Sequence, residues 1–382
     1  MKRLGLTTVF LFLTMFSSST AQSFAQPFAY VTDTGPFPGR VLILDTKTNE
    51  TVGEVDVEIV PFGVAVSPDG GEVYVTNVIG GLSIIDTSDN SVVATVAVGA
   101  RPIGVTVAPD GSEVFVANAS DGTVSVVDVA SRAVVATVPL GAEATGVIVH
   151  PDGSRLYVST QNDATVEVVD IATRTIVASI PIGSNGSGID VAPSGDEVYV
   201  VDDIADNLVI IDTATDTVAA TVPVGSAPNG VAVHPEGVAV YVSNFFGNSV
   251  SVVDPVSRTV TATVAVGLGP EGISVHPDGD RLYVVNVSEG TVSVIQLASM
   301  SVVEVLDFGP DVFPISFGDF IGPLGLGGVV DRMTPRLVRC RNLTTGRSVV
   351  VRDGATRWDC EAAGLEVGAD DRVVIQVRGR VD

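Results

Sequence analysis

The chain has 382 residues, with 20 Lys and Arg against 45 Asp and Glu, and its net charge is −25 at pH 7. Residues 27–330 hold 8 of the basic and 37 of the acidic residues, a balance of −29. Such a field repels polyphosphate, so nucleic-acid binding across this region is disfavoured. We interpret the acidity as a solubility feature of a salty or extracytoplasmic medium; attraction of divalent cations or cationic partners is the alternative.

The N-terminus has the pattern of a secretory signal peptide over residues 1–25. Lys2 and Arg3 precede an apolar run from Leu4 to Phe16, and small and polar residues follow, with cleavage expected after Ala21 or Ala25. The apolar run is short for a membrane span. We therefore expect a periplasmic, secreted or cell-surface protein without a transmembrane segment once the signal is removed; an uncleaved anchor is the alternative.

A repeat of about 42 residues fills the chain up to residue 321. The aromatic residue of "EVYVTN" (residues 72–77) recurs at steps of 44, 41 and then four times 42 residues, as Tyr30, Tyr74, Phe115, Tyr157, Tyr199, Tyr241 and Tyr283. Each copy contains four short Val-rich runs bounded by Gly, Pro, Asp, Asn and Ser, which is typical of β-strands joined by tight turns. Seven such copies predict an all-β fold, a seven-bladed β-propeller of four-stranded blades over residues 28–321.

The two ends of the repeat region predict how the propeller closes. The chain enters in a second strand, "FAYVTD", and leaves with a lone first strand at residues 313–317. We expect this last strand to complete the blade that the N-terminus opens. The seven aromatic residues occupy equivalent positions, so we interpret them as spacers between adjacent blades, not as a ligand cage.

The "YVTN" at 74–77, together with the "PDG" turns and the "VVD" ends of the third strands, resembles the YVTN-type β-propeller repeat family of bacterial and archaeal exported and surface proteins. The resemblance covers roughly residues 28–323. It implies a seven-bladed propeller and an extracytoplasmic setting. It implies no single activity, because relatives occur as surface proteins, as propeller subunits near redox enzymes and near propeller lactonases.

The C-terminal segment differs in composition from the repeats. A Gly-rich linker is expected at residues 322–334, followed by a small Arg-rich β module at 335–382. Cys340 and Cys360 are the only cysteines, and in an exported protein such a pair predicts a disulfide that would stabilise a small module. The module also resembles a small Cys-paired unit appended to some secreted bacterial proteins. For the role of this module, we favour docking on the propeller or a simple contribution to stability over attachment to a surface.

No nucleophile motif, phosphate loop or metalloprotease motif occurs in the chain. His150, His234 and His276 each stand directly before the Pro of a first hairpin turn, a slot that Ser or Ala fills in other blades. We interpret them as turn residues at the solvent edge, not as zinc ligands.

The mouth of the central funnel is where we expect any ligand site, because the loops entering each first strand and those joining second to third strands share one face of a propeller. These loops supply the candidate ligand-binding residues Arg101, Glu143, Asn185, Asp202, Asp203, Asn229, Asn244, Phe245, Phe246, Glu271 and Asp311. Glu143, Glu271 and Asp311 are the candidate ligands of calcium or another divalent cation, because hard cations take several oxygen ligands. A solvated acidic rim, and packing of the two Phe rings on the rim, are the alternatives.

The sequence favours a non-enzymatic exported scaffold that binds a protein or glycan partner, because the repeat is regular and lacks a catalytic constellation. Two alternatives stay open. One is a metal-dependent propeller enzyme, lactonase-like or lyase-like, that uses acids of the funnel. The other is an accessory subunit of a periplasmic redox system. Oligomeric state is not predicted.

Overall fold

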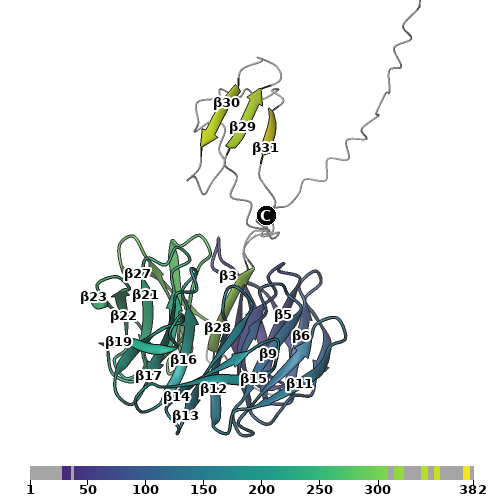
Figure 1. Ribbon diagram of the computed structural model, residues 1–382, viewed down its shortest axis with the longest axis vertical. Helices are drawn as coiled ribbons and strands as arrows, with labels where there is room; N and C mark the ends of the chain where they lie inside the picture. Colours follow the sequence, from purple (N-terminus) through teal and green to yellow (C-terminus); the bar gives the residue numbers. More distant parts are fainter. Residues whose placement is uncertain are drawn as a thin grey trace, which may run out of the picture. The chain divides into compact units, whose positions relative to one another are not determined.

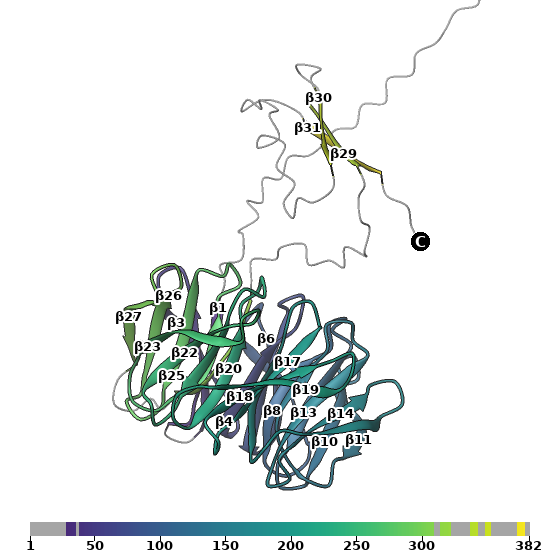
Figure 2. The ribbon, with the colours of Figure 1, turned by 60° about the vertical axis from the view of Figure 1, so that its left-hand side comes forward.

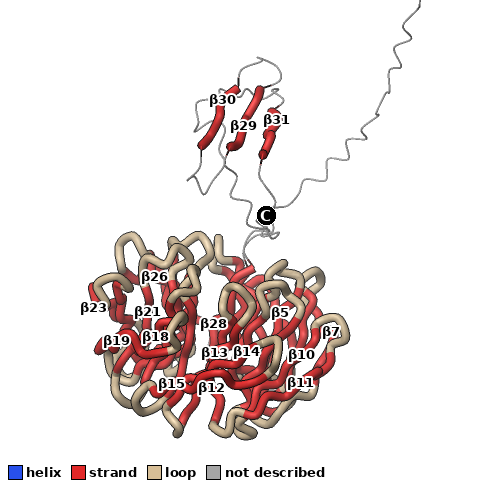
Figure 3. The backbone as a smooth tube through the Cα atoms, viewed as in Figure 1, coloured by secondary structure: helices blue, strands red, loops and turns tan. Residues whose placement is uncertain are grey.

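The computed structural model describes residues 28–35 and 38–308 in full, and the backbone of 314–321, 337–342, 348–352 and 373–378. These residues form β-strands and loops, without a helix among them (Figure 3). Accordingly, no described segment is a helix able to span a membrane. The chain divides into two compact units between Leu324 and Gly325. The predicted signal peptide lies outside the described residues.

The first unit is a ring of seven four-stranded antiparallel sheets, as predicted (Figures 1 and 2). Blades 1 to 3 consist of β28 (Pro314–Ile321), β1 (Phe28–Asp33), β2 (Arg40–Asp45), β3 (Glu50–Asp56); β4 (Ile59–Val66), β5 (Glu72–Ile79), β6 (Gly81–Asp86), β7 (Ser91–Val96); and β8 (Pro102–Val107), β9 (Glu113–Asn118), β10 (Thr123–Asp128), β11 (Ala133–Pro139). Blades 4 and 5 consist of β12 (Glu143–Val149), β13 (Arg155–Gln161), β14 (Thr165–Asp170), β15 (Thr175–Pro181); and β16 (Gly186–Val191), β17 (Glu197–Asp202), β18 (Asn207–Asp212), β19 (Thr217–Pro223). Blades 6 and 7 consist of β20 (Pro228–Val233), β21 (Val240–Asn244), β22 (Ser249–Asp254), β23 (Thr259–Ala265); and β24 (Pro270–Val275), β25 (Arg281–Asn286), β26 (Thr291–Gln296), β27 (Ser301–Asp307).

Blade 1 joins the two ends of the repeat region. β28 pairs antiparallel with β1, with Phe28 opposite Ile321 and Thr32 opposite Ser316. The predicted closure is therefore confirmed. Pairing the last strand with the first removes the sheet edge that an open blade would leave.

The aromatic residue of each second strand lies at a boundary between blades, which confirms its interpretation as a spacer. All seven are at most 2 % exposed. Tyr74 of blade 2, for example, packs in one cluster with Val114 and Val116 of blade 3. Likewise Tyr283 of blade 7 packs with Leu44 of blade 1. The core of the propeller is thus a set of seven apolar layers, one between each pair of neighbours.

The Asp that ends the third strand closes the following hairpin turn. In blade 3, Asp128 Oδ1 accepts a hydrogen bond from the main-chain N–H of Ser131 at 2.7 Å. The same Asx-type turn follows Asp45, Asp86, Asp170, Asp212 and Asp254. Bonding its own backbone two or three residues on is the reason Asp suits this position.

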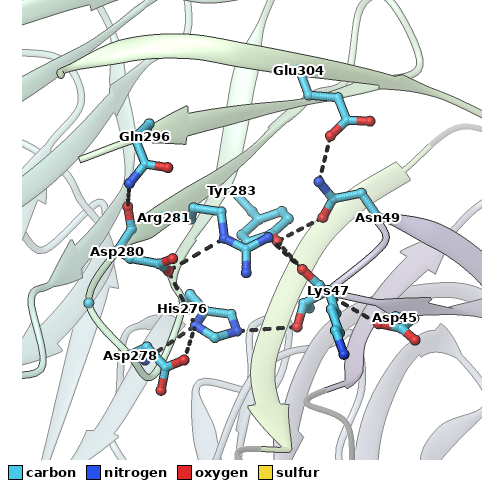
Figure 4. A network of polar contacts seen from close by, with 12 residues as sticks. Asp45, Lys47, Asn49, His276, Asp278, Asp280, Arg281, Tyr283, Gln296 and Glu304 are labelled. Atoms are coloured by element: carbon cyan, nitrogen blue, oxygen red, sulfur yellow. Dashed lines mark hydrogen bonds and ion pairs between the residues drawn. The ribbon is translucent and has the colours of Figure 1, made fainter. Parts of the chain in front are cut away.

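The three histidines join one blade to the next through their first hairpin turns. His150 and His234 contact the main-chain oxygens of Gly195 and Gly279, at 2.9 and 3.1 Å from Nε2. At the junction of blades 7 and 1, His276 Nε2 lies 3.2 Å from Thr46 Oγ1 (Figure 4). The expected turn position is confirmed, but solvent exposure is wrong for two of them, because His234 is 8 % and His276 1 % exposed.

The second unit contains a three-stranded antiparallel sheet in the order β30–β29–β31. Its strands are β29 (Leu337–Asn342), β30 (Ser348–Arg352) and β31 (Val373–Arg378). Cys340 belongs to β29, where only the backbone is described, and Cys360 lies outside the described residues. The Cys340–Cys360 disulfide and the linker and module boundaries therefore stay predictions.

Candidate functional site: the central cavity

Six innermost strands carry a β-bulge at the same height. In blade 6, Pro228 pairs with Asn244 and Val231 with Val242, so that Asn229 and Gly230 together oppose the single residue Ser243. The same two-residue gap in the register occurs at Phe62–Gly63, Ile103–Gly104, Thr145–Gly146, Ser187–Gly188 and Glu271–Gly272. A bulge bends a strand and redirects a side chain. We call the first residue of each pair the bulge residue.

The second residue of each bulge is glycine because neighbouring inner strands approach closely there. A Cβ on Gly63 would lie 2.3 Å from the main-chain oxygen of Ile103, the bulge residue of the next blade. A Cβ on Gly230 would lie 2.5 Å from the main-chain oxygen of Glu271. A side chain in this position would push the inner strands apart, so glycine sets the diameter of the ring.

The hydroxyl in the third position of the "YVTN" segment bridges two blades. Thr76 Oγ1 accepts from the amide of Gly63 at 2.9 Å and donates to the main-chain oxygen of Ile103 at 2.7 Å. Ser159 and Ser243 make the equivalent pair of bonds in blades 4 and 6. Ala117, Val201 and Val285 occupy this position in blades 3, 5 and 7, so the bridge occurs in only some blades.

A cavity of about 520 Å³ lies inside the ring. We call it the central cavity. All six bulge residues and their glycines line it, and Val60, Val78, Arg101 and Gln161 line it at the face that carries the loops entering each first strand. We call this face the loop face. A volume of this size accommodates a small molecule or a few side chains of a partner.

Glu271 is the acidic residue among the described lining of this cavity. Its side chain makes no hydrogen bond or ion pair with another described residue. Burial raises the pKa of the Glu271 carboxyl from 4.5 to about 7. Desolvation without a compensating cation has this effect because it disfavours the charged form of a carboxyl.

Arg101 lines the cavity, but its charge already has a partner. Its Nη1 donates to Glu143, whose other carboxylate oxygen accepts from Asn162 Nδ2 at 3.2 Å. Glu143 itself does not line the central cavity. Thus the structure brings Arg101, Asn229 and Glu271 together at the cavity and places Glu143 beside it, on the loop face.

Four other predicted residues hold loops in place. Asp202 is buried and accepts from the main-chain N–H groups of Ser184 and Asn185. Asn185 Nδ2 donates to Asp203 at 2.8 Å. Asn244 is also buried, and its Nδ2 donates to Ser251 Oγ at 3.0 Å. None of these four residues lines the central cavity.

Phe245 and Phe246 lie on the loop between β21 and β22. Their rings meet edge to face with centroids 5.2 Å apart. Phe245 lies against Gly269 of the next loop, where a Cβ would be 3.3 Å from its ring. Phe246 points outward and is 74 % exposed. Of the two, therefore, one packs on the loop face and the other is free to contact a partner.

The described residues hold no group of three or more His, Cys, Asp or Glu placed to bind a metal ion. Asp311 lies outside them. The proposed calcium ligands Glu143, Glu271 and Asp311 therefore stay a prediction, in which Glu143 would have to exchange its partner Arg101 for the ion.

Seven residues that line the cavity were not among the predicted site residues: Val60, Phe62, Val78, Ile103, Thr145, Gln161 and Ser187. A signal for most of them was present. The residue directly before the glycine of each first strand varies from blade to blade, whereas its neighbours stay small or apolar. Aligning the copies of the repeat at this glycine would have identified the bulge residues.

No protein-family model matches the chain, and no curated protein matches it. Solved structures are similar. A chain of Kuenenia stuttgartiensis hydrazine synthase is 25% identical over 68% of this chain and 90% of its own, with a TM-score of 0.63. A functionally unknown protein from Desulfotomaculum acetoxidans DSM 771 is 18% identical over 78% and 99%, with a TM-score of 0.69. Dihydro-heme d1 dehydrogenase NirN in complex with DHE is 17% identical over 75% and 64%, with a TM-score of 0.59. The ring of blades and these likenesses together identify the chain as a seven-bladed β-propeller.

Proposed function

We propose that the protein is a non-enzymatic binding scaffold whose loop face docks a protein partner. The observation that carries this proposal is the set of large apolar side chains exposed on that face. Ile204, Phe246 and Leu268 stand on loops of the neighbouring blades 5, 6 and 7, in that order, and Ile79 stands on blade 2. We call these four residues the apolar rim.

The composition of the apolar rim fits a protein surface. Phe246 and Ile204 are 74 % and 70 % exposed, which costs free energy in water unless a partner covers them. Aromatic and aliphatic anchors within a polar surround are typical of protein interfaces. Three of the four residues are aliphatic and lack the flat face on which a sugar ring stacks. A protein therefore suits the rim better than a glycan.

The test compares capture by three immobilised forms of the full chain: wild type, Ile204→Ser with Phe246→Ser, and Val256→Ser. Val256 is 92 % exposed in the hairpin between β22 and β23, away from the loop face, and so provides a matched control. We expect one protein from the extracytoplasmic fraction of the native source to bind wild type and the control but not the double variant, and to bind again when purified. Equal capture by all three forms would refute a docking role for the rim, and turnover of a substrate that depends on a cavity residue would refute the non-enzymatic assignment.

The setting that we propose for this scaffold is extracytoplasmic, within the YVTN-type repeat family. The signal-like N-terminus and the "YVTN", "PDG" and "VVD" segments support this proposal. Detection of the mature N-terminus at residue 22 or 26 in an exported fraction tests the setting, and an intact N-terminus in the cytoplasm would exclude it.

An accessory subunit beside a redox enzyme is the second candidate. The likeness to a hydrazine synthase chain, at 25% identity over 90% of that chain, favours it. Under this proposal the captured protein is an oxidoreductase, and its gene lies next to the gene for this chain. A captured partner without a redox centre would remove this candidate and leave the scaffold.

A further inference from the structure

The bulge residues make the central cavity amphipathic. Phe62 and Ile103 of blades 2 and 3 place apolar side chains on one arc of the lining. Ser187, Asn229 and Glu271 of blades 5, 6 and 7 place polar ones on the opposite arc. Since these blades contribute the same position of the repeat, the difference between the arcs arises from the side chains and not from the backbone.

The polar arc has unused hydrogen-bonding capacity. The side chains of Gln161, Ser187, Asn229 and Glu271 make no hydrogen bond or ion pair with another described residue. By contrast, Thr145 on the blade between the arcs bonds the main-chain oxygen of Gly186 at 3.0 Å. Half-buried amides and a carboxyl without protein partners are groups that a ligand can satisfy.

The charges around the cavity decide which ligand is favoured. An anion would meet Glu271 and a repeat region of net charge −29, while Arg101, the cation among the described lining residues, is already paired with Glu143. A bare divalent cation requires more oxygen ligands than a single carboxylate provides, and no group of three acids or histidines occurs among the described residues. An organic cation needs only one carboxylate and a few acceptors.

We propose that the central cavity binds a small organic ammonium ion with an apolar body. Its charged nitrogen would donate to Glu271 and to the oxygens of Asn229 and Gln161, and its apolar part would lie on Phe62 and Ile103. The raised pKa of Glu271 supports this assignment, because a bound cation would replace the solvation that burial removes. The inference goes beyond the scaffold role: ammonium binding can fail while capture by the apolar rim succeeds, and the reverse.

The test uses three probes that share a phenyl ring and differ in charge: phenethylammonium, 2-phenylethanol and phenylacetate. Binding to the full chain is measured by calorimetric titration at about pH 8, where an alkylammonium keeps its charge. We expect phenethylammonium to bind about tenfold or more tightly than 2-phenylethanol, the difference that one half-buried ion pair makes, and phenylacetate to bind more weakly than both.

Two variants locate the site. Glu271→Gln should reduce the affinity for phenethylammonium to that for 2-phenylethanol, while Phe62→Ala should weaken both by a similar factor. Glu289→Gln is the matched control, because Glu289 is an exposed acid on the loop face of the same blade and does not line the cavity. Glu289→Gln removes the same charge from the same face. It should leave the affinity for phenethylammonium unchanged if the Glu271 carboxyl acts by direct contact with the ligand.

Three outcomes would overturn the proposal. One is no binding of phenethylammonium to wild type up to about 10 mM. The second is equal affinity for the charged and the neutral probe. The third is an equal loss of affinity in Glu271→Gln and Glu289→Gln, which would assign the effect to the general acidic field. The probe series on wild type needs no variant, so the proposal can be refuted even if a substitution disturbs folding.

Discussion

The hydroxyl of Ser243 in blade 6 donates a hydrogen bond of 2.6 Å to the main-chain oxygen of Glu271 in blade 7. The same hydroxyl accepts from the amide of Gly230 at 2.9 Å. Ser243→Ala would leave both main-chain groups without this partner, and we expect it to lower the free energy of unfolding by about 1–2 kcal/mol. Ser243→Thr is the control, because Thr76 makes the same bridge in blade 2. Urea unfolding measures both, and an unchanged midpoint for Ser243→Ala would show that the bridge contributes nothing.

Glu271 should make the protein less stable as pH rises. Its folded pKa of about 7 lies above the ordinary 4.5, so between these values the folded state holds more protons than the unfolded state. Stability from this group is therefore present below about pH 4.5 and is lost as pH rises through about 7. Glu271→Gln should raise the free energy of unfolding by on the order of 1–3 kcal/mol at about pH 8 and change it little at about pH 5. Thermal melts at the two pH values test this, with Glu289→Gln as control; a gain of equal size at both pH values would contradict it.

Gly230→Ala should destabilise the ring. The added methyl would lie 2.5 Å from the main-chain oxygen of Glu271, 2.9 Å from Ile273 Cγ2 and 3.0 Å from Ser243 Oγ, so the strand would have to move to admit it. We expect a loss of about 1–3 kcal/mol or more, as for other overpacked positions. Gly53→Ala on outer strand β3 is the matched control, because its added methyl would lie 3.5 Å from Ile43 Cδ1, an ordinary contact. Denaturant unfolding compares the two, and equal stabilities would mean that the inner strands can move apart.

His276 should make the junction of blades 7 and 1 sensitive to acid. Burial and then Arg281 lower its pKa below the ordinary 6.5, while Asp278 and Asp280 act in the opposite direction, and Thr46 of blade 1 contacts its Nε2 (Figure 4). Because the unfolded state takes up the proton first, stability from this group is lost as pH falls below about 6.5.

Replacing His276 tests this sign. His276→Gln should show a smaller loss of stability between about pH 7 and about pH 5 than wild type, in thermal melts. His150→Gln is the control, since His150 has the same turn position in blade 4 but is less buried. If both variants keep the full acid loss of the wild type, another group is responsible.

Much of the fold was predictable because each blade repeats the same local signals. The aromatic spacing predicted seven second strands, and the lone strand after residue 312 predicted the closure of blade 1. The bulges were not predicted. They depend on the close approach of neighbouring inner strands, and residues that meet in this way, such as Gly230 and Glu271, are 41 positions apart in the sequence.

The site was predicted in part. Arg101, Asn229 and Glu271 line the cavity because they precede or begin inner strands, as the loop argument required. Asp202 and Asn244 also end strands on the loop face, but short polar side chains there bond nearby main-chain and hydroxyl groups and turn away from the cavity. Residue type does not show whether such a side chain lines the cavity or bonds a nearby loop, because both kinds of residue carry the same carboxylate and amide groups. The direction of the side chain decides between the two positions, and the neighbouring loop fixes that direction.

The bulge gives six blades one position whose side chain differs from blade to blade while the backbone stays the same. Its glycine sets the spacing of the ring, the second-strand aromatic residue fills the layer between blades, and the bulge residue faces the interior space. Copies of such a unit can diverge at that single codon while the architecture stays constant. One substitution at such a position therefore changes the chemistry of the cavity wall without a change in the ring.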